Sequence, residues 1–396
     1  MCEDTEVYIV AACRTPLGHF LGGLRNLTAA ELAAAVIREA VSRAGVEPGG
    51  VEEVILGVAV TAGLGPAPAK RAAGLAGLPP AVGGFSVSQG SGSGLKAVSV
   101  AVQALRSEER NIVVACGTES MSRAPHVLMG VREGAPFGDL VVKDALVQGG
   151  LWCAYGDQPM GQAAEVAADK FGISRQDQDA FALQSHQRAV KAAAHGYFKD
   201  EIVRVEAPSA DGRQAAVEAD EGPRRDMTVE KLAQYPPAFK KDGTVTAGNA
   251  SSLSDGAAAL VLASDEGLKA KGLKPLARIL FTATAGLEPA FALIAPQAAI
   301  EKVVADAGWK LHAVDLFEID EVFAVQPLVT IKALGLDPDR VNVHGGGVAL
   351  GHPVGATGAR ILTTLLYALR HRGLKKGVAS LCMAGGDALA MAVEVV

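Results

Sequence analysis

The chain has few aromatic residues, no excess of positive charge and no long apolar run. Only 5% of its 396 residues are aromatic, and Lys plus Arg (37) are fewer than Asp plus Glu (43), which leaves a net charge of −6. A chain without a basic field is not expected to bind nucleic acid. Because no apolar run is long enough to span a bilayer, we expect no membrane partner, and the 49% of hydrophobic residues are expected to build a well-packed core.

Cysteine is also scarce, and its spacing excludes two kinds of site. The five cysteines are odd in number and widely scattered: Cys2, Cys13, Cys116, Cys153 and Cys382. This pattern is neither a disulfide scaffold nor a metal site, so we expect no metal and a reducing compartment. The acidic start runs directly into the apolar stretch 7–10 without a signal peptide, which favours the cytoplasm.

The length of the chain predicts two or three domains. Strand and helix patterns alternate from Val7 to about Cys116, which predicts an α/β fold with βαβ units and a mainly parallel sheet. From residue 122 to about 246 the chain has more charge and scattered Gly and Pro. This part is predicted to be an insertion with one long helix, which begins at Ser174 with Asp177 in a carboxylate variant of the capping box.

Two glycine-rich turns indicate that one structural unit occurs twice in the chain. Residues 89–94 follow an apolar run and open a helix, and residues 351–358 place His352 just before a helix that is expected to open at Ala359. Gly94 then corresponds to Gly358, and other paired segments keep the same offset of about 260 residues, far longer than a solenoid repeat. Two similar halves are the simplest interpretation.

Four positions could carry chemistry, and each has a plainer alternative. Ser91 lies where a strand ends and a helix begins, so peptide N–H groups would favour negative charge there, although the turn could equally be a tight connection. His352 alone could be structural, but its place at the duplicate of the Ser91 turn favours catalysis. Cys382 follows the last strand and could be an inert buried thiol. The pair Asp320-Glu321 ends a strand, where α/β sheets bind ligands, and could instead be two solvated charges.

Motifs along the whole chain resemble those of the thiolases, the family of acetyl-CoA acetyltransferases and 3-ketoacyl-CoA thiolases. They are Ala12-Cys13-Arg14-Thr15-Pro16, Gly92-Ser93-Gly94-Leu95-Lys96-Ala97, the stretch 243–251, Gly351-His352-Pro353 and Cys382. The resemblance implies two duplicated α/β/α/β/α halves, an inserted loop domain that covers coenzyme A, and a homodimer or homotetramer. The expected parts are residues 1–121 and 249–272 for the first half, 122–248 for the loop domain and 273–396 for the second half.

The resemblance also implies a ping-pong acyl transfer between acyl-CoA molecules, with coenzyme A or acyl-CoA as substrate and no permanently bound cofactor. Ser91 takes the position of the nucleophile, His352 activates it, Cys382 acts as acid and base, and Asp320 lies at the first oxyanion site. Backbone N–H groups of Ser91 and Ala384 would form an oxyanion hole. The positions implied to contact coenzyme A are Arg224, Ala247, Ser251 and Phe323.

The sequence departs from the family pattern at several of these positions. The nucleophilic cysteine of the family is Ser91 here, and a hydroxyl is less acidic than a thiol, so attack needs nearly full proton removal by His352. Asp320 replaces an asparagine, and Pro159 replaces a histidine. Ser88 and Gly90 also differ from the family, so we interpret Ser91 as the native residue.

Three functions therefore stay open at this point. The first is a thiolase-type acyl-CoA C-acyltransferase that works through Ser91. The second is a catalytically impaired homologue that binds acyl-CoA. The third is a serine-ester acyltransferase or hydrolase.

Overall fold

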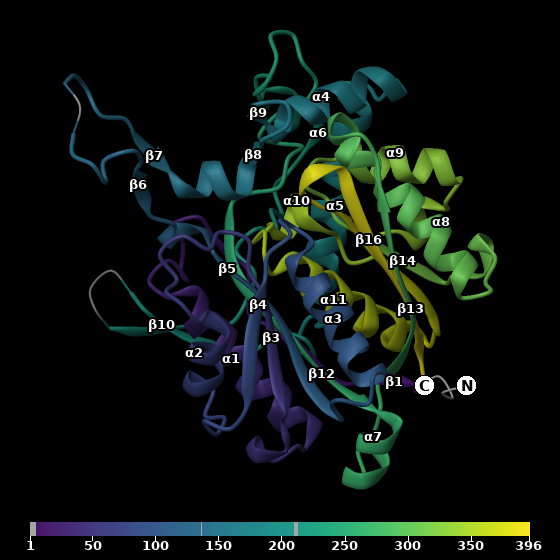
Figure 1. Cartoon of the computed structure of the whole chain (residues 1–396). Coiled ribbons are helices and arrows are strands. Elements are labelled where there is room, and N and C mark those ends of the chain that lie inside the picture. The colour runs from purple at the N-terminus through teal and green to yellow at the C-terminus, as the bar shows by residue number, and fades with distance from the viewer. Residues whose placement is uncertain (1–4, 136, 210–212) are drawn as a thin grey trace.

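The computed structural model describes residues 5–135, 137–209 and 213–396. Its main sheet has ten strands, nine of them in the order β14-β15-β16-β13-β1-β12-β5-β3-β4 with β2 paired to β12 (Figure 1). The strands are β1 (Val7–Arg14), β2 (Gly18–His19), β3 (Glu53–Gly57), β4 (Gly83–Val87), β5 (Ile112–Ser120), β12 (Ser254–Ser264), β13 (Ala277–Gly286), β14 (Leu316–Ile319), β15 (Lys376–Cys382) and β16 (Asp387–Val395). The helices packed on the sheet or at its edges are α1 (Ala29–Ala44), α2 (Pro68–Leu75), α3 (Ser93–Arg106), α7 (Asp265–Lys271), α8 (Pro296–Asp306), α9 (Val325–Leu334), α10 (Gly347–Leu350) and α11 (Thr357–Arg372).

The sheet repeats one strand pattern, as the duplicated turns predict. In the first half β1, β12 and β5 pair antiparallel and β3 continues parallel to β5. In the second half β13, β16 and β15 pair antiparallel and β14 continues parallel to β15. The two halves join through the antiparallel pair β1–β13. The α/β fold built from two similar halves is confirmed.

The predicted mainly parallel sheet is wrong. Only β3–β4, β3–β5 and β14–β15 are parallel pairs. The strand that closes each half, β12 or β16, returns beside the strand before it and pairs antiparallel. The sequence from Val7 to Cys116 contains the βαβ part of the first half but not β12, which follows the inserted segment.

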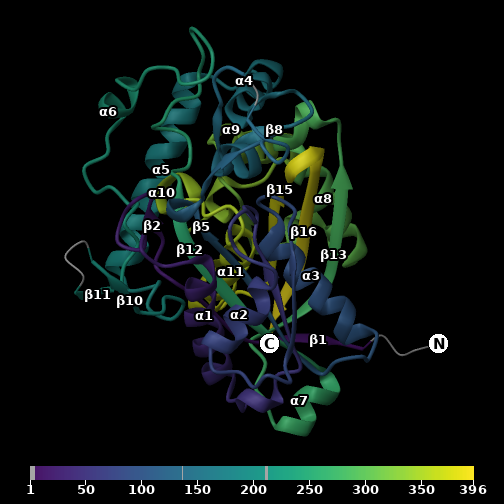
Figure 2. The same ribbon diagram turned by 60° about the vertical axis from the view of Figure 1, so that its left-hand side comes forward.

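The hydrophobic clusters define five layers of alternating helix and sheet. Helices α1 and α2 cover one face of the first half-sheet, and α8 covers the outer face of the second. Helices α3 and α11 lie between the two half-sheets and pack on both (Figures 1 and 2). Successive residues of a strand therefore enter different layers, because Val114 faces α1 while Val113 and Ala115 face α3 and α11.

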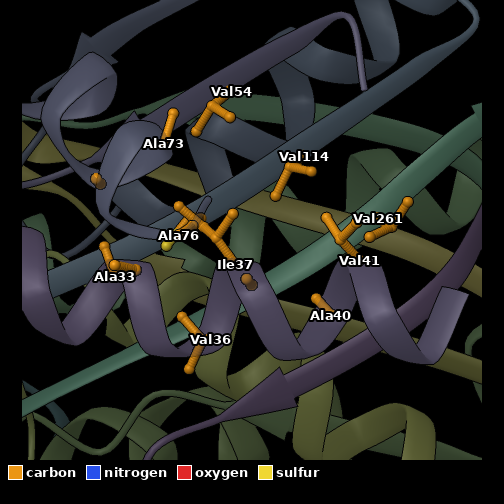
Figure 3. Packing of buried hydrophobic residues seen from close by; sticks show 14 of the residues in the cluster. Ala33, Val36, Ile37, Ala40, Val41, Val54, Ala73, Ala76, Val114 and Val261 are labelled. Carbon is orange, nitrogen blue, oxygen red and sulfur yellow. The ribbon is translucent and has the colours of Figure 1, made fainter. Parts of the chain in front are cut away.

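Helix α1 illustrates how the outer layer forms. Thr28 and Glu31 form a capping box at its start, and Gly45 ends it in the left-handed conformation. The residues at helical spacing Ala33, Ile37, Ala40 and Val41 point toward the sheet, where Figure 3 shows them around Val114 and its neighbours.

The described residues between β5 and β12 add no strand to the main sheet. It contains the hairpins β6 (His126–Leu128) with β7 (Val142–Asp144), β8 (Trp152–Cys153) with β9 (Gln158–Pro159), and β10 (Val205–Pro208) with β11 (Gln214–Val217). Its helices are α4 (Met160–Phe171), α5 (Arg175–Ala194) and α6 (Val229–Ala233). The long helix with its Ser174–Asp177 capping box is confirmed as α5. The shorter helix α4, of twelve residues, was not predicted.

Short helical turns η1–η7 connect these elements, and three of them flank the site: η3 (Val147–Leu151), η4 (Pro289–Ile294) and η7 (Ala384–Gly386). Within the described ranges, no helix combines the length and apolar character needed to cross a membrane. The bounds proposed for the four parts of the chain stay predictions.

Candidate active site

Ser91 lies in the turn that joins β4 to α3. Gly90 has φ +56°, which glycine adopts without strain, and Gly92 precedes the first residue of the helix. The buried hydroxyl of Ser93 holds the turn, since it accepts a hydrogen bond from Gln89 N at 2.9 Å and donates one to Gly90 O at 2.7 Å. This turn leaves the Ser91 side chain half-buried, directly before the amino end of a 14-residue helix.

His352 lies in the corresponding turn before α11, which begins at Thr357 rather than at the predicted Ala359. Gly351 has φ +112°, and a Cβ atom there would lie 2.3 Å from Ser254 Oγ. The backbone N–H of His352 donates to Ser252 O at 3.1 Å. The close approach of Gly351 to Ser254 and this hydrogen bond fix the loop to the start of β12. The imidazole of His352 is only 5% exposed.

The two turns meet because the helices that follow them touch through glycine. A Cβ atom on Gly94 would lie 2.8 Å from Ala359 N, and one on Gly358 would lie 2.3 Å from Leu95 N. The amino ends of α3 and α11 can approach this closely only without side chains at both positions. As a result Ser91 Oγ lies 3.0 Å from His352 Nε2, although the residues are 261 positions apart.

The second ring nitrogen of His352 has two neighbours. Thr357 Oγ1 lies 3.0 Å from Nδ1, and Asp320 Oδ1 lies 3.3 Å from it. The Thr357 hydroxyl donates its proton to Pro353 O at 3.0 Å. Thr357 was not identified from the sequence, although its place in the same turn as His352 is a usable signal.

Asp320 and Glu321 follow β14, and both are fully buried, so the alternative of two solvated charges is wrong. Glu321 is structural, since it accepts hydrogen bonds from Ser185 Oγ (2.7 Å), Asn342 Nδ2 (2.8 Å) and Val348 N (3.1 Å). Among the described residues, neither carboxylate oxygen of Asp320 has a hydrogen-bond partner. Within the described chain, His352 is the one basic side chain in ion-pair range of Asp320.

Cys382 ends β15 and is 4% exposed. Burial raises the pKa of this thiol well above its usual value, and the Asp320 carboxylate raises the pKa further. The thiol is therefore protonated at neutral pH and is suited to donate a proton. It packs in the cluster that contains Leu293, Ile294 and Phe323, so these apolar side chains surround the sulfur.

The two residues after Cys382 contact the Ser91 turn. A Cβ atom on Gly92 would lie 2.4 Å from Met383 Cγ, and one on Gly90 would lie 3.3 Å from Ala384 N. The positive φ angles in this turn fall on Gly385 and Gly386, so alanine at position 384 causes no backbone strain. Ser91, His352, Asp320, Cys382 and Ala384 therefore come from different elements of both halves and lie around one place.

The positions implied to contact coenzyme A, Arg224, Ala247, Ser251 and Phe323, range from exposed to buried. Arg224 and Ala247 are exposed and line one small cavity, together with His186 and Ser252. Ser251 N donates to Val322 O at 2.9 Å. Phe323 is 6% exposed and belongs to the cluster of Cys382.

Two of these positions have partners in the structure. The Arg224 guanidinium donates to the Tyr235 hydroxyl at 2.9 Å. The ring of Phe323 meets that of Phe239 edge-on, with 5.9 Å between their centres. Pro159, where a histidine was expected by resemblance, precedes α4, and the next residue Met160 packs against the apolar cluster of Cys382. No group of three or more His, Cys, Asp or Glu side chains that could hold a metal ion exists among the described residues.

Comparisons with known proteins agree along the entire chain. Residues 7–266 match the family "Thiolase, N-terminal domain" and residues 273–395 match "Thiolase, C-terminal domain". The chain is 47% identical to an acetyl-CoA acetyltransferase of Pseudomonas aeruginosa over 386 residues, which cover 98% of each chain. It is 49% identical to the acetyl-CoA acetyltransferase of Chromobacterium violaceum over 389 residues, which cover 98% of this chain and 99% of the relative.

Solved structures show the same similarity. The acetyl-CoA acetyltransferase of Bacillus anthracis superposes with a TM-score of 0.97 at 44% identity, and human mitochondrial 3-ketoacyl-CoA thiolase with a TM-score of 0.96 at 38% identity. In both cases the match covers 99% of each chain.

Proposed function

The chain belongs to the thiolase family and is an acyltransferase of the thiolase type, and we propose that its acyl group is carried by the oxygen of Ser91. The observation behind this proposal is the distance of 3.0 Å between Ser91 Oγ and His352 Nε2. A hydroxyl becomes a nucleophile only when a base takes its proton as the new bond forms, and a base at hydrogen-bond distance can do so.

In the first step the Ser91 oxygen attacks the thioester carbon of an acyl-CoA while its proton moves to His352 Nε2. The carbon–sulfur bond breaks, coenzyme A leaves as a thiol after it takes a proton, and the acyl group stays on Ser91 as an oxygen ester. N–H groups at the start of α3 and at Ala384 would stabilise the negative oxygen that forms during attack. In the second step the acyl group passes to coenzyme A or to the α-carbon of acetyl-CoA.

Cys382 is proposed as the acid and base for the second substrate. Its buried thiol carries a proton at neutral pH, because burial and Asp320 both raise its pKa. The thiol can give this proton to a leaving carbanion in the cleavage direction. In the condensation direction it would first have to lose the proton, so we expect cleavage to be the faster direction at neutral pH.

Coenzyme A is proposed to bind along the path from Arg224 through Ala247 and Ser251 to Phe323. The support is their order from the exposed rim to the apolar cluster of Cys382. The exposed Arg224 side chain would meet a phosphate, and the small side chains of Ala247 and Ser251 leave room for the pantetheine arm.

The proposal is tested by incubating the protein with acetyl-CoA and measuring its intact mass. We expect one acetyl group, located on Ser91 by peptide mass spectrometry, and no acetyl group on the Ser91→Ala variant. The Ser91→Cys variant should cleave acetoacetyl-CoA with coenzyme A faster than the wild type, because a thiol loses its proton more readily than a hydroxyl. An unmodified wild-type protein combined with a silent Ser91→Cys variant would support the impaired homologue instead.

We further propose that the protein works as a homodimer or homotetramer in the cytoplasm. Strand β4 ends the sheet with Phe85 40% exposed, and the projecting hairpin β6–β7 exposes Leu128 and Val142 (Figure 1). The described cysteines are free thiols, which suits a reducing compartment. Light scattering on the purified protein should give two or four chain masses, and a single chain mass would contradict the oligomer.

A further inference from the structure

The neighbours of His352 extend the pair with Ser91 to a third group. Asp320 Oδ1 lies 3.3 Å from the ring nitrogen Nδ1, and Ser91 Oγ lies 3.0 Å from the other nitrogen. A serine, a histidine and an aspartate thus lie in series, in the order found in serine hydrolases. All three come from different elements, so the series arises from the packing of the two halves.

The hydrogen bonds around Nδ1 determine which tautomer of His352 is present. The Thr357 hydroxyl gives its single proton to Pro353 O, so it can only accept from Nδ1. Asp320 Oδ1 lies at ion-pair distance from Nδ1 without a hydrogen bond, so the Thr357 hydroxyl determines the tautomer. This hydroxyl requires a proton on Nδ1, which leaves the lone pair of Nε2 directed at the Ser91 hydroxyl.

Asp320 has no other polar partner to satisfy it. It is fully buried, and neither of its oxygens accepts a hydrogen bond from any described residue. A buried carboxylate without partners is unstable unless a positive charge forms beside it. Such a charge forms when His352 takes the proton of Ser91. Asp320 therefore stabilises the imidazolium that exists during the reaction.

We propose that Ser91, His352 and Asp320 act as a hydrolytic triad, and that the protein hydrolyses acyl-CoA thioesters to a carboxylic acid and coenzyme A. The inference rests on the proposed function, because it needs the acyl-Ser91 ester as an intermediate. Asp320 is a positioning residue in this reaction, since it acts through His352.

The hydrolytic step balances with water as the second reactant. Water attacks the carbonyl carbon of the Ser91 ester while His352 Nε2 takes one of its protons. The bond between Ser91 Oγ and the carbonyl carbon breaks, and His352 returns the proton to Oγ. The acid is released and Ser91 is restored, so no other reactant is consumed.

Chemistry also favours water over a thiol as the acceptor. Coenzyme A is a better leaving group than a serine alkoxide, so return of the acyl group from Ser91 to the thiol is uphill. Transfer to water is downhill and uses the same base. A serine at this position with an aspartate behind the histidine therefore directs the acyl group to water.

The experiment uses the full-length protein with acetyl-CoA in heavy-oxygen water and measures acetate and acetoacetyl-CoA together. We expect the wild type to form more acetate than acetoacetyl-CoA, with one heavy oxygen atom in each acetate. Ser91→Ala should form neither product, and Ser91→Cys should form less acetate and more acetoacetyl-CoA.

Asp320→Asn tests the third member of the series. Asparagine has no negative charge to stabilise the imidazolium, and we expect kcat for acetate formation to fall at least about 100-fold. The KM for acetyl-CoA should stay within a factor of about two, because Asp320 acts through His352, whereas a distorted pocket would change both constants. The same substitution should have a smaller effect on acetoacetyl-CoA cleavage in the Ser91→Cys background. Asp315→Asn, directly before β14, is the matched control and should keep the wild-type rate.

The possible results separate this inference from the function on which it rests. Acetylation of Ser91 without release of acetate would overturn the triad and leave the acyl-Ser91 proposal intact. Wild-type hydrolysis by Asp320→Asn would also overturn it. If Ser91 is never acetylated, both proposals fail together.

Discussion

Two oxygens of different character lie beside His352 Nδ1. Asp320 supplies charge, while Thr357 supplies direction, because its hydroxyl is anchored to Pro353 O by its own proton. The ring is therefore fixed by an acceptor in its own turn, and the carboxylate that follows β14 lies beside it at ion-pair distance. Loss of either group should lower the rate without unfolding the protein.

Thr357→Val should lower kcat for acyl-CoA turnover about tenfold. Valine has nearly the same shape but no hydroxyl, so His352 Nδ1 loses an acceptor worth about 1.4 kcal/mol. The matched control is Thr363→Val in the same helix, where a buried hydroxyl donates to Ala359 O at 2.9 Å far from the imidazole. Steady-state kinetics of both variants should show the loss only at position 357, and equal losses would mean that Thr357 acts only in stabilising the helix.

A buried histidine outside the site should make stability sensitive to acid. Burial, together with the positive charges of the nearby Arg372 and His371, lowers the pKa of His344 to about 4. The folded protein therefore holds this ring neutral, while the unfolded chain binds a proton near pH 6.5. The stability from the neutral ring is complete above about pH 6.5 and is lost as pH falls toward 4, by about 3 kcal/mol in full.

His344→Phe should remove this loss, because phenylalanine can still stack on Tyr197 but cannot bind a proton. We expect the free energy of unfolding, measured with denaturant from pH 7 to pH 4, to decrease less steeply than in the wild type. Tyr197→Phe keeps both the stack and His344, so its pH dependence should match that of the wild type. Equal slopes for wild type and His344→Phe would refute the assignment.

The candidate residues could be found from the sequence, but their relation could not. Ser91 and His352 stand in glycine-rich turns, and Cys382 stands shortly before two glycines. A window of about ten residues is enough to recognise a glycine-rich turn before a helix. Asp320 was expected at an oxyanion site, not beside the imidazole. Its distance to His352 depends on how β14 packs beside α11, which no local pattern contains.

The helices α3 and α11 act as one unit. Both begin with a glycine-rich turn, and each carries a glycine where the other helix approaches. The correspondence of Gly94 with Gly358 was predictable from the offset of the two halves. That the pair is a contact, rather than two similar turns far apart, follows only from the layered packing.

Gly94→Ala should separate Ser91 from His352. The new methyl group would lie 2.8 Å from Ala359 N and 2.9 Å from Gly355 O, and both are backbone atoms that cannot rotate away. We expect a loss of about 1–3 kcal/mol in the free energy of unfolding and a much larger fractional loss of activity, because the reacting groups move apart.

Gly74→Ala is the matched control for this substitution. Gly74 lies inside α2 with open space around it, so alanine should raise stability by about 0.5–1 kcal/mol. Thermal unfolding and acyl-CoA turnover should be measured on both variants. Wild-type activity in folded Gly94→Ala would show that the close approach of the two helices is not needed.

The elements that could not be predicted from the sequence are those whose position depends on contacts with distant segments. Strand β12 reads as a buried element, but its antiparallel place between β1 and β5 could not be predicted, because the inserted segment separates it from β5 in the sequence. Helix α4 was missed because its small residues Ala163, Ala164, Ala167 and Ala168 give a weak apolar pattern. All four are buried against the site.

The molecule as a whole depends on the attachment of the inserted segment to the sheet. Arg14, the last residue of β1, is fully buried and pairs with Glu201 at 2.7 Å and with Asp220 at 2.7 and 2.9 Å. Both carboxylates belong to the segment between β5 and β12, which also carries Arg224 and Ala247. The same segment therefore needs Arg14 to hold the proposed coenzyme A path against the sheet.

Arg14→Met should cost about 3–5 kcal/mol of unfolding free energy, because it leaves two buried carboxylates without their partner. Hydrogen exchange should rise first around Glu201 and Asp220, and the KM for acyl-CoA should rise before kcat falls, since the coenzyme A path loosens while Ser91 and His352 keep their contact. Arg204→Met is the matched control, because Arg204 is 62% exposed and pairs with exposed Glu206, a contact worth less than about 1 kcal/mol. Equal stability of the two variants would mean that the apolar contacts of the insertion hold it without the buried ion pairs, and the segment would then fold independently of β1.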